Sequence, residues 1–397
     1  MSQNLPTFVL VVMQILEGMT KTEIQEKALR AWEDAGRVGG VFLPPGTGKT
    51  RLGVMAYESC GKPTTLVVTS RVPLVEQWKE EGIDADVLCI NTACKIQREV
   101  DLLIVDEVHR SLSPVFRKLY ENVKYKYLLT LSGTRPEKEE YEEFLERVSP
   151  TVYTEELQDL VEAGGILAPV KIYNVPCKFD KYNQAKYRAF DGKFIEATIA
   201  LSGMIRSRYN SFASAFELAR AAKDSQGFDE YTKRMAKQFW SAMTMRKFSV
   251  YNNTEKIKFA KEVIERFPSR KWIIFTKTIS MAEEVAKTVG GLLYHSKLSS
   301  AERQKILDDF SSSSKHLIAV DALNEGLNVP SADSALVLSG VSTVLTNIQQ
   351  IGRVSRMVEG KEALIINAVT ENTVEQRWVT NKNKKLMSVW TTLDSIS

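Results

Sequence analysis

The sequence is poor in the residues that form cross-links and transition-metal centres. Its 397 residues include only four cysteines and three histidines. No C-x-x-C pair occurs among the cysteines, which are Cys60, Cys89, Cys94 and Cys177. We therefore expect no structural zinc, and free thiols in a reducing compartment rather than disulfides.

A hydrophobic run long enough to cross a bilayer is also missing near the N-terminus. The apolar run from Phe8 to Leu16 is interrupted by Gln14, has no basic residue ahead of it and is followed by no small-residue cleavage site. Such a run is too short for a membrane span and lacks the features of a secretion signal. We expect it to be buried and the protein to be cytoplasmic.

The overall charge is small, and the composition is that of a folded protein. Net charge is +4, with 44% hydrophobic and 26% charged residues, which excludes a disordered chain. The length favours two or three domains. This charge permits nucleic acid as a partner but does not require it.

A phosphate-binding pattern is the strongest positive signal. The segment 43–50 reads Leu-Pro-Pro-Gly-Thr-Gly-Lys-Thr, follows a short apolar strand pattern and precedes a helical one, as a phosphate loop requires. Glycine lets backbone N–H groups turn toward a polyphosphate, and the helix N-terminus adds its dipole. The residues expected at the phosphates are Pro45, Gly46, Thr47, Gly48, Lys49 and Thr50. Lys49 should pair with the β and γ phosphates, and Thr50 should hold Mg²⁺.

Two adjacent carboxylates, Asp106 and Glu107, end a buried strand pattern at residues 101–106. Burying them is costly unless a cation lies at that edge of the sheet. We expect Asp106 to hold Mg²⁺, largely through water, and Glu107 to orient and deprotonate an attacking water.

Strand and helix patterns alternate along both halves of the chain. Strands are expected at 65–69, 86–90, 101–106, 272–276 and 317–320, with helices between them. This alternation predicts an α/β fold with parallel sheets. Gln25, on an amphipathic helix at 21–32, has an amide that suits an adenine edge, although a surface glutamine is the commoner case.

Several motifs together resemble those of superfamily 2 helicases and translocases. They are the phosphate loop, Asp-Glu-Val-His at 106–109, Leu-Ser-Gly-Thr-Arg-Pro at 131–136, and segments 272–276, 321–330 and 349–356. The resemblance covers most of residues 20–380. It implies two RecA-like domains, at 1–150 and 256–397, of which the second closes over ATP and Mg²⁺ held by the first.

The resemblance also implies roles for individual residues. Arg353 and Arg356 lie on one helical face and suit arginine fingers, with Gln349 beside them in the same motif. Gly326 and Asn328 are expected near the nucleotide, and Ser132 and Thr134 to couple it to the nucleic acid. The expected contacts to backbone phosphates are Arg71, Thr92, Thr276 and Lys277.

Within the superfamily, Asp-Glu-Val-His, Ser-Gly-Thr and segment 163–169 look most like the XPB and phage UvsW-type DNA helicase group. The compact length suits a phage-encoded or stand-alone enzyme. If the protein is phage-encoded, we expect it in the host cytoplasm. The resemblance implies DNA, with forked or branched forms preferred, as the partner. The nucleotide cleft needs only one copy of the chain, so we expect a monomer. Val320 and Asn328 depart from residues common in relatives.

Residues 151–180 are expected to form a linker and the first strand of the second domain, and residues 181–255 a helical insertion. Over 181–250 there are 13 Lys and Arg against 6 Asp and Glu, a difference of +7. We expect these cations to contact phosphates and most of the interleaved aromatic residues to form a core.

The sequence therefore predicts an ATP-dependent DNA helicase that translocates on and unwinds or remodels branched DNA. Three alternatives stay open. They are a double-stranded DNA translocase that does not separate strands, an RNA helicase, and a nucleic-acid clamp gated by ATP without processive movement.

Overall fold

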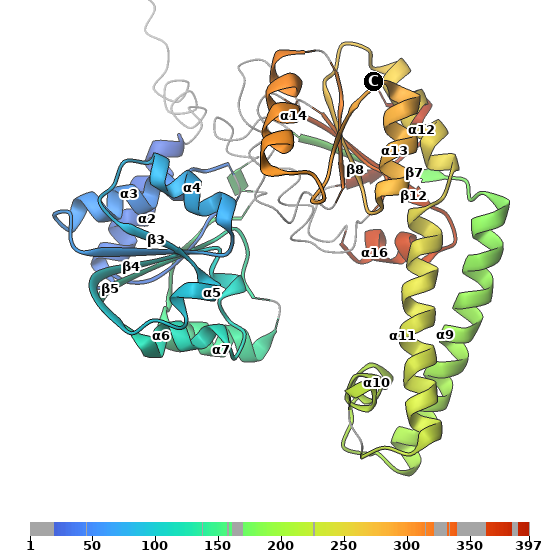
Figure 1. Cartoon of the computed structure of the whole chain (residues 1–397), viewed down its shortest axis with the longest axis horizontal. Helices are drawn as coiled ribbons and strands as arrows, with labels where there is room; N and C mark the ends of the chain where they lie inside the picture. Colours follow the sequence, from blue (N-terminus) through green and yellow to red (C-terminus); the bar gives the residue numbers. More distant parts are fainter. Residues whose placement is uncertain are drawn as a thin grey trace, which may run out of the picture. The chain divides into compact units, whose positions relative to one another are not determined.

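The computed structural model describes residues 20–44, 46–136, 138–156, 159–160, 170–224, 227–313, 315–320, 332, 334–339, 363–382 and 388–396. The chain divides into two units near residue 171, and each unit is built around its own β-sheet (Figure 1). The expected α/β fold with two parallel-sheet domains is confirmed.

The first unit contains a six-stranded sheet in the order β3-β2-β4-β5-β1-β6, and every neighbouring pair in it is parallel. Its strands are β1 (Val38–Phe42), β2 (Thr65–Thr69), β3 (Asp86–Cys89), β4 (Arg98–Asp106), β5 (Val123–Ser132) and β6 (Thr151–Thr154). In the register, Asp106 pairs with Leu131 and Phe42 with Ser132. The carboxyl ends of β1, β4 and β5 therefore meet at one edge, where α/β sheets bind ligands.

Helices cover both faces of this sheet (Figure 1). One face carries α2 (Lys21–Asp34), α3 (Lys49–Ser59) and α4 (Val72–Glu80), and the other carries α5 (Ile90–Ala93), α6 (Leu119–Asn122) and α7 (Glu139–Val148). Two short turns, η1 (Val108–Arg110) and η2 (Phe116–Lys118), complete the unit. Alternate strand residues supply the two cores, since Val67 faces α3 and α4 whereas Leu66 and Val68 face α5.

The first unit extends beyond residue 150, where we expected it to end. Thr151–Thr154 forms β6 and pairs with β1. Two glycines on β1 allow this approach, because a Cβ at Gly39 would lie 2.4 Å from Val152 and Gly40 N donates to Pro150 O at 2.8 Å. The next strand, β7 (Val170–Cys177), belongs to the other sheet.

The second unit contains a seven-stranded sheet in the order β13-β7-β12-β11-β8-β10-β9. Its remaining strands are β8 (Trp272–Thr276), β9 (Leu292–Tyr294), β10 (Leu317–Val320), β11 (Ser334–Val337), β12 (Ala363–Thr370) and β13 (Ser388–Trp390). Its helices are α12 (Glu255–Arg266), α13 (Ile279–Val289), α14 (Ser300–Ser312) and α16 (Val374–Lys382), with a final turn η4 (Leu393–Ser395). β13 is an element that the sequence patterns did not predict.

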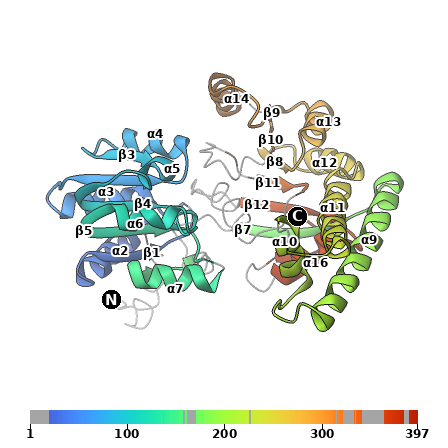
Figure 2. The same cartoon turned by 60° about the horizontal axis from the view of Figure 1, so that its bottom comes forward.

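A helical hairpin projects from the second unit between β7 and α12. It consists of α9 (Lys181–Ser207), α10 (Ala215–Asp224) and α11 (Glu230–Tyr251), with α9 and α11 side by side in Figures 1 and 2. Six of the twelve aromatic residues at 181–250 pack between the helices. The aromatic members of this core are Phe194, Tyr209, Phe212, Phe228, Phe239 and Trp240.

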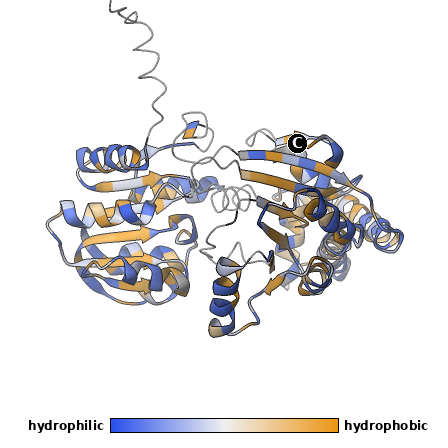
Figure 3. Cartoon of the chain, turned by 90° about the horizontal axis from the view of Figure 1, so that it is seen from above, coloured by the Kyte–Doolittle hydropathy of each residue, from blue (hydrophilic) through white to orange (hydrophobic). Residues whose placement is uncertain are grey.

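Hydropathy follows the layers in both units. The strands are largely apolar, and the helices that cover them are amphipathic (Figure 3). Among the described residues, no helix is long and apolar enough to cross a membrane. The run at residues 8–16 lies outside the described residues.

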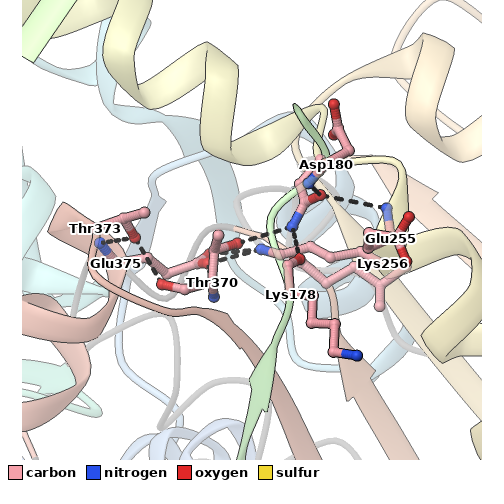
Figure 4. Close-up of polar contacts among 9 residues, drawn as sticks. Lys178, Asp180, Glu255, Lys256, Thr370, Thr373 and Glu375 are labelled. Atoms are coloured by element: carbon pink, nitrogen blue, oxygen red, sulfur yellow. Dashed lines mark hydrogen bonds and ion pairs between the residues drawn. The ribbon is translucent and has the colours of Figure 1, made fainter. Parts of the chain in front are cut away.

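A buried ion pair lies in the second unit. Lys256 and Glu375 are both 0% exposed, and Lys256 Nζ lies 2.7 Å from Glu375 Oε2 (Figure 4). Lys256 also donates to Leu338 O, and Thr370 N donates to Glu375 Oε2 at 2.9 Å. The pair therefore joins α12, α16 and the end of β12.

Candidate nucleotide site

The phosphate loop connects β1 to α3. Gly46 and Gly48 have φ values of +90° and +86°, in the left-handed region that favours glycine. Thr47 is buried, and its hydroxyl donates to Pro44 O at 2.8 Å. Helix α3 begins at Lys49, directly after Gly48, so its free N–H groups line the loop as an anion site requires. Pro45 lies outside the described residues.

Lys49 lies across the loop, and its Nζ donates to Leu43 O at 3.1 Å. Leu43 directly follows β1, so the ammonium lies at the carboxyl edge of the sheet. Burial raises the pKa of the Asp106 carboxyl, and the positive charge of Lys49 offsets a small part of that rise. Loop and carboxylates are therefore parts of one site.

Gln25 belongs to this site and is not a surface residue. It is 7% exposed, and its Nε2 donates to Thr47 O at 2.7 Å. Helix α2 presents it because Ile24, Ala28 and Trp32 anchor the adjacent face in the core. A Cβ on Gly48 would lie 2.2 Å from Gln25 Nε2. The amide thus supports the loop backbone, whereas its role at adenine stays a prediction.

Asp106 ends β4 as a buried carboxylate. Its Oδ2 accepts from Trp78 Nε1 at 3.0 Å, and its Oδ1 accepts from Glu107 N at 2.9 Å. Burial, with the charge of Glu107 as the second cause, raises the pKa of Asp106 to about 6. Glu107 has a φ of +56°, a conformation that costs energy for a residue with a side chain and is common at functional sites.

His109 connects the carboxylates to the end of β5. Its Nδ1 lies 2.9 Å from Ser132 Oγ and 3.3 Å from Glu107 Oε2. Burial lowers the pKa of His109 to about 3, so the imidazole is neutral near pH 7 and makes no ion pair with Glu107. The Ser132 hydroxyl donates to Thr134 O at 2.8 Å, which assigns the proton of the His109 contact to Nδ1.

The carboxylate edge fits a divalent cation. Glu107 Oε2 is buried without a hydrogen bond, and Asp106 is ionised at a cost that a nearby cation would offset. Oxygen donors from a hydroxyl and a carboxylate are those that Mg²⁺ prefers when phosphates and water complete its shell. In the parts of the chain that the structure covers, no group of three or more His, Cys, Asp or Glu side chains forms a protein-only metal site. Thr50 and Asp106 are thus suitable ligands for a metal that arrives with a nucleotide.

The expected nucleic-acid contacts lie in both units. Arg71 directly precedes α4, and Thr92 is exposed on α5. Thr276 is 2% exposed at the end of β8, and Lys277 follows it. Thr276 is therefore the least accessible of the four.

Five predicted site residues lie outside the described residues, in addition to Pro45. They are Gly326, Asn328, Gln349, Arg353 and Arg356. Conversely, the structure brings Gln77 and Trp78 to the site, and sequence reasoning missed both. The sequence offered one signal for them, namely that Gln77 carries an amide and Trp78 an indole N–H on the helix that directly follows Arg71.

Fold and site together define a nucleotide-binding α/β protein of the phosphate-loop class. Residues 255–358 match the family described as "Helicase conserved C-terminal domain". The chain is 28% identical over 380 residues to "DNA 3'-5' translocase XPB2" of Sulfurisphaera tokodaii, covering 89% of this chain and 82% of that protein.

Two further similarities agree with this one. The chain is 23% identical over 382 residues to "Putative DNA 3'-5' helicase Rad25" of Haloarcula marismortui, covering 88% of this chain. It spans 52% of that longer protein. Among solved structures, the Pyrococcus furiosus Hef helicase domain shares the fold, with a TM-score of 0.57 and 15% identity over 90% of this chain and 97% of that one.

Proposed function

We propose that this protein is an ATP-dependent DNA helicase or translocase. One observation carries the proposal. Phosphate-loop residues Lys49 and Thr50 lie at the same sheet edge as Asp106 and Glu107, in a chain that resembles a DNA 3'-5' translocase along 89% of its length. The finer proposals are ATP with Mg²⁺ as cofactors, movement in the 3'-to-5' direction and a preference for forked or branched DNA.

Each of these side chains has a separate role in the proposed hydrolysis of ATP. Bound Mg²⁺ would neutralise phosphate charge. Lys49 binds the β and γ phosphates, and Glu107 orients the attacking water and accepts its proton. His109 Nδ1 contacts Ser132 Oγ and lies 3.3 Å from Glu107 Oε2, and this proximity of Ser132 to Glu107 makes Ser132 and Thr134 candidates for the coupling role. Arg353 and Arg356 would stabilise charge on the transferred phosphoryl group.

The hairpin supports DNA as the partner. Six of its twelve aromatic residues are internal, whereas most of its cations are exposed and available to phosphates. Arg246 is an exception, since it is buried and pairs with Asp191 at 2.8 Å. The exposed cations are Lys181, Lys186, Arg188, Lys193, Arg206, Arg208, Arg220, Lys223, Arg234 and Lys237.

ATP hydrolysis by the wild type and by Lys49→Ala tests the proposal. We expect strong stimulation of the wild type by DNA, most by forked or four-way substrates, and little turnover by the variant. Matched RNA distinguishes an RNA helicase. Equal turnover with and without every nucleic acid would refute a motor and leave the ATP-gated clamp.

A translocase that does not separate strands is the second candidate, because the relative from Sulfurisphaera tokodaii carries the name translocase. Displacement of a triplex-forming strand without unwinding of a forked duplex would establish it. Unwinding of the forked duplex would establish the helicase.

A further inference from the structure

Two consecutive side chains of α4 reach both proposed metal ligands. Gln77 Nε2 donates to Thr50 Oγ1 at 3.3 Å. Trp78 Nε1 donates to Asp106 Oδ2 at 3.0 Å. Neither Gln77 nor Trp78 belongs to the phosphate loop or to the carboxylate pair, yet each holds one oxygen donor of the metal site.

The indole of Trp78 is held by core packing and by a hydrogen bond. It is 1% exposed and lies against α3 at Gly53, where an added Cβ would be 2.3 Å from its ring. A glycine inside a helix costs stability relative to alanine, and here its missing side chain makes room for the ring. Its N–H also supplies Asp106 with a hydrogen bond that this buried carboxylate needs.

The other end of α4 lies at a proposed DNA contact. Arg71 is the residue before the helix, and Thr69 Oγ1 donates to its carbonyl oxygen at 3.1 Å. From Arg71 to Gln77 a helix rises roughly 9 Å as a stiff element. A force on Arg71 therefore moves Gln77 and Trp78 with it, because no loop intervenes.

We propose that Gln77 and Trp78 are positioning residues that orient Thr50 and Asp106 for Mg²⁺, and that α4 transmits DNA contact at Arg71 to the metal site. The second part rests on the proposed function, whereas the first requires only nucleotide and metal. Contacts of this kind behind a metal ligand typically change metal affinity by about tenfold or more when they are removed.

The test measures Mn²⁺ binding by electron paramagnetic resonance, in the full-length chain with a non-hydrolysable ATP analogue, with and without a forked DNA oligonucleotide. Trp78→Phe removes the indole N–H, and we expect it to weaken Mn²⁺ binding about tenfold. Gln77→Met, at a partly exposed site, should weaken it less. DNA should strengthen Mn²⁺ binding in the wild type, and by reciprocity Mn²⁺ should strengthen DNA binding. In both variants this mutual effect should shrink.

Trp32→Phe is the matched control. Trp32 is 0% exposed in the same unit, and its Nε1 donates to Leu128 O at 2.8 Å, so the control loses the same N–H and volume but no contact with Thr50 or Asp106. If Trp78→Phe and Gln77→Met bind Mn²⁺ as Trp32→Phe does, the positioning role is wrong. DNA affinity without nucleotide, measured by fluorescence anisotropy, should stay unchanged in both variants, since Arg71 is intact.

The two proposals fail in different ways. If no nucleic acid stimulates the wild-type ATPase, the motor proposal and transmission through α4 both fail, while weakened Mn²⁺ binding by Trp78→Phe still supports positioning. If DNA stimulates ATPase and strengthens Mn²⁺ binding equally in the wild type and the variants, the motor stands and transmission through Gln77 and Trp78 is wrong.

Discussion

Removal of one partner of the Lys256–Glu375 pair should destabilise the second unit strongly. Both side chains are 0% exposed, so Lys256→Met leaves a carboxylate buried without its cation. Breaking a buried pair from one side costs about 3–5 kcal/mol. Replacing both partners, as in Lys256→Met with Glu375→Leu, should cost much less, because no unpaired charge remains.

The magnitude follows from the geometry. At the 2.7 Å separation of Nζ and Oε2, attraction at an effective dielectric constant of 20 is about 6 kcal/mol. The desolvation of two ions offsets most of this gain. The Thr370 N–H at 2.9 Å lowers the cost of burying the carboxylate, but it cannot replace the ammonium. Lys256→Met should therefore lower the free energy of unfolding far more than replacement of both charged residues by apolar ones.

Thermal unfolding followed by tryptophan fluorescence measures the effect, since Trp272 is buried in the same unit. A loss of 3–5 kcal/mol corresponds to a fall of roughly 10 °C in the Tm of a unit of this size. Lys258→Met is the control, because Lys258 lies on the same helix with its side chain 69% exposed and contacts Glu255 at 2.7 Å. Its pair should contribute under about 1 kcal/mol. A Lys256→Met variant as stable as this control, or a double variant as unstable as the single one, would refute the reasoning.

Three further predictions concern the first unit. Gly48→Ala should lower the free energy of unfolding by at least about 1 kcal/mol and abolish binding of a fluorescent ATP analogue. The reason is that Gly48 has a φ of +86° and that a Cβ there would meet Gln25. Unchanged binding of the analogue would contradict this. Gly53→Ala should overpack Trp78 and cost about 1–3 kcal/mol in urea unfolding; a neutral effect would show that the ring is free to shift. The third prediction concerns His109, whose pKa is lowered from 6.5 to about 3 in the folded protein. Below pH 6.5 only the unfolded chain therefore binds this proton. The free energy of unfolding should fall by up to about 1.4 kcal/mol for each unit by which the pH is lowered. His109→Asn should lack that loss between pH 7 and 5, and an identical pH dependence in urea unfolding would show that His109 is not the cause.

Short-range patterns predicted which residues meet at the carboxyl edge of the first sheet. The loop at Gly46–Thr50 and the carboxylates at Asp106 and Glu107 are defined by neighbours in sequence, and strand and helix order fixes where they meet. The position of Gln25 was harder to predict, because nothing in the local sequence pattern distinguishes a surface amide from one that supports the loop 22 residues away.

Contacts between distant segments were not predictable in the same way. Lys256 and Glu375 are separated by 119 positions, and no periodicity marks either as buried. β6 depends on glycines more than a hundred residues earlier in β1. Nothing in the sequence around Trp78 distinguishes it from a core residue of a helix, and only its indole N–H at Asp106 shows a second role.

The helical hairpin enters and leaves its unit at neighbouring points. Asp180 N donates to Asn253 Oδ1 at 3.0 Å, and Thr254 N donates to Asp180 Oδ2 at 2.9 Å. A short turn could therefore replace the hairpin beyond its base, where Tyr187 and Val250 pack against Val374 of α16, and loop closure of that kind carries a small entropic cost. The hairpin can therefore be lengthened, shortened or transferred to another protein without a change in the sheet of the second unit.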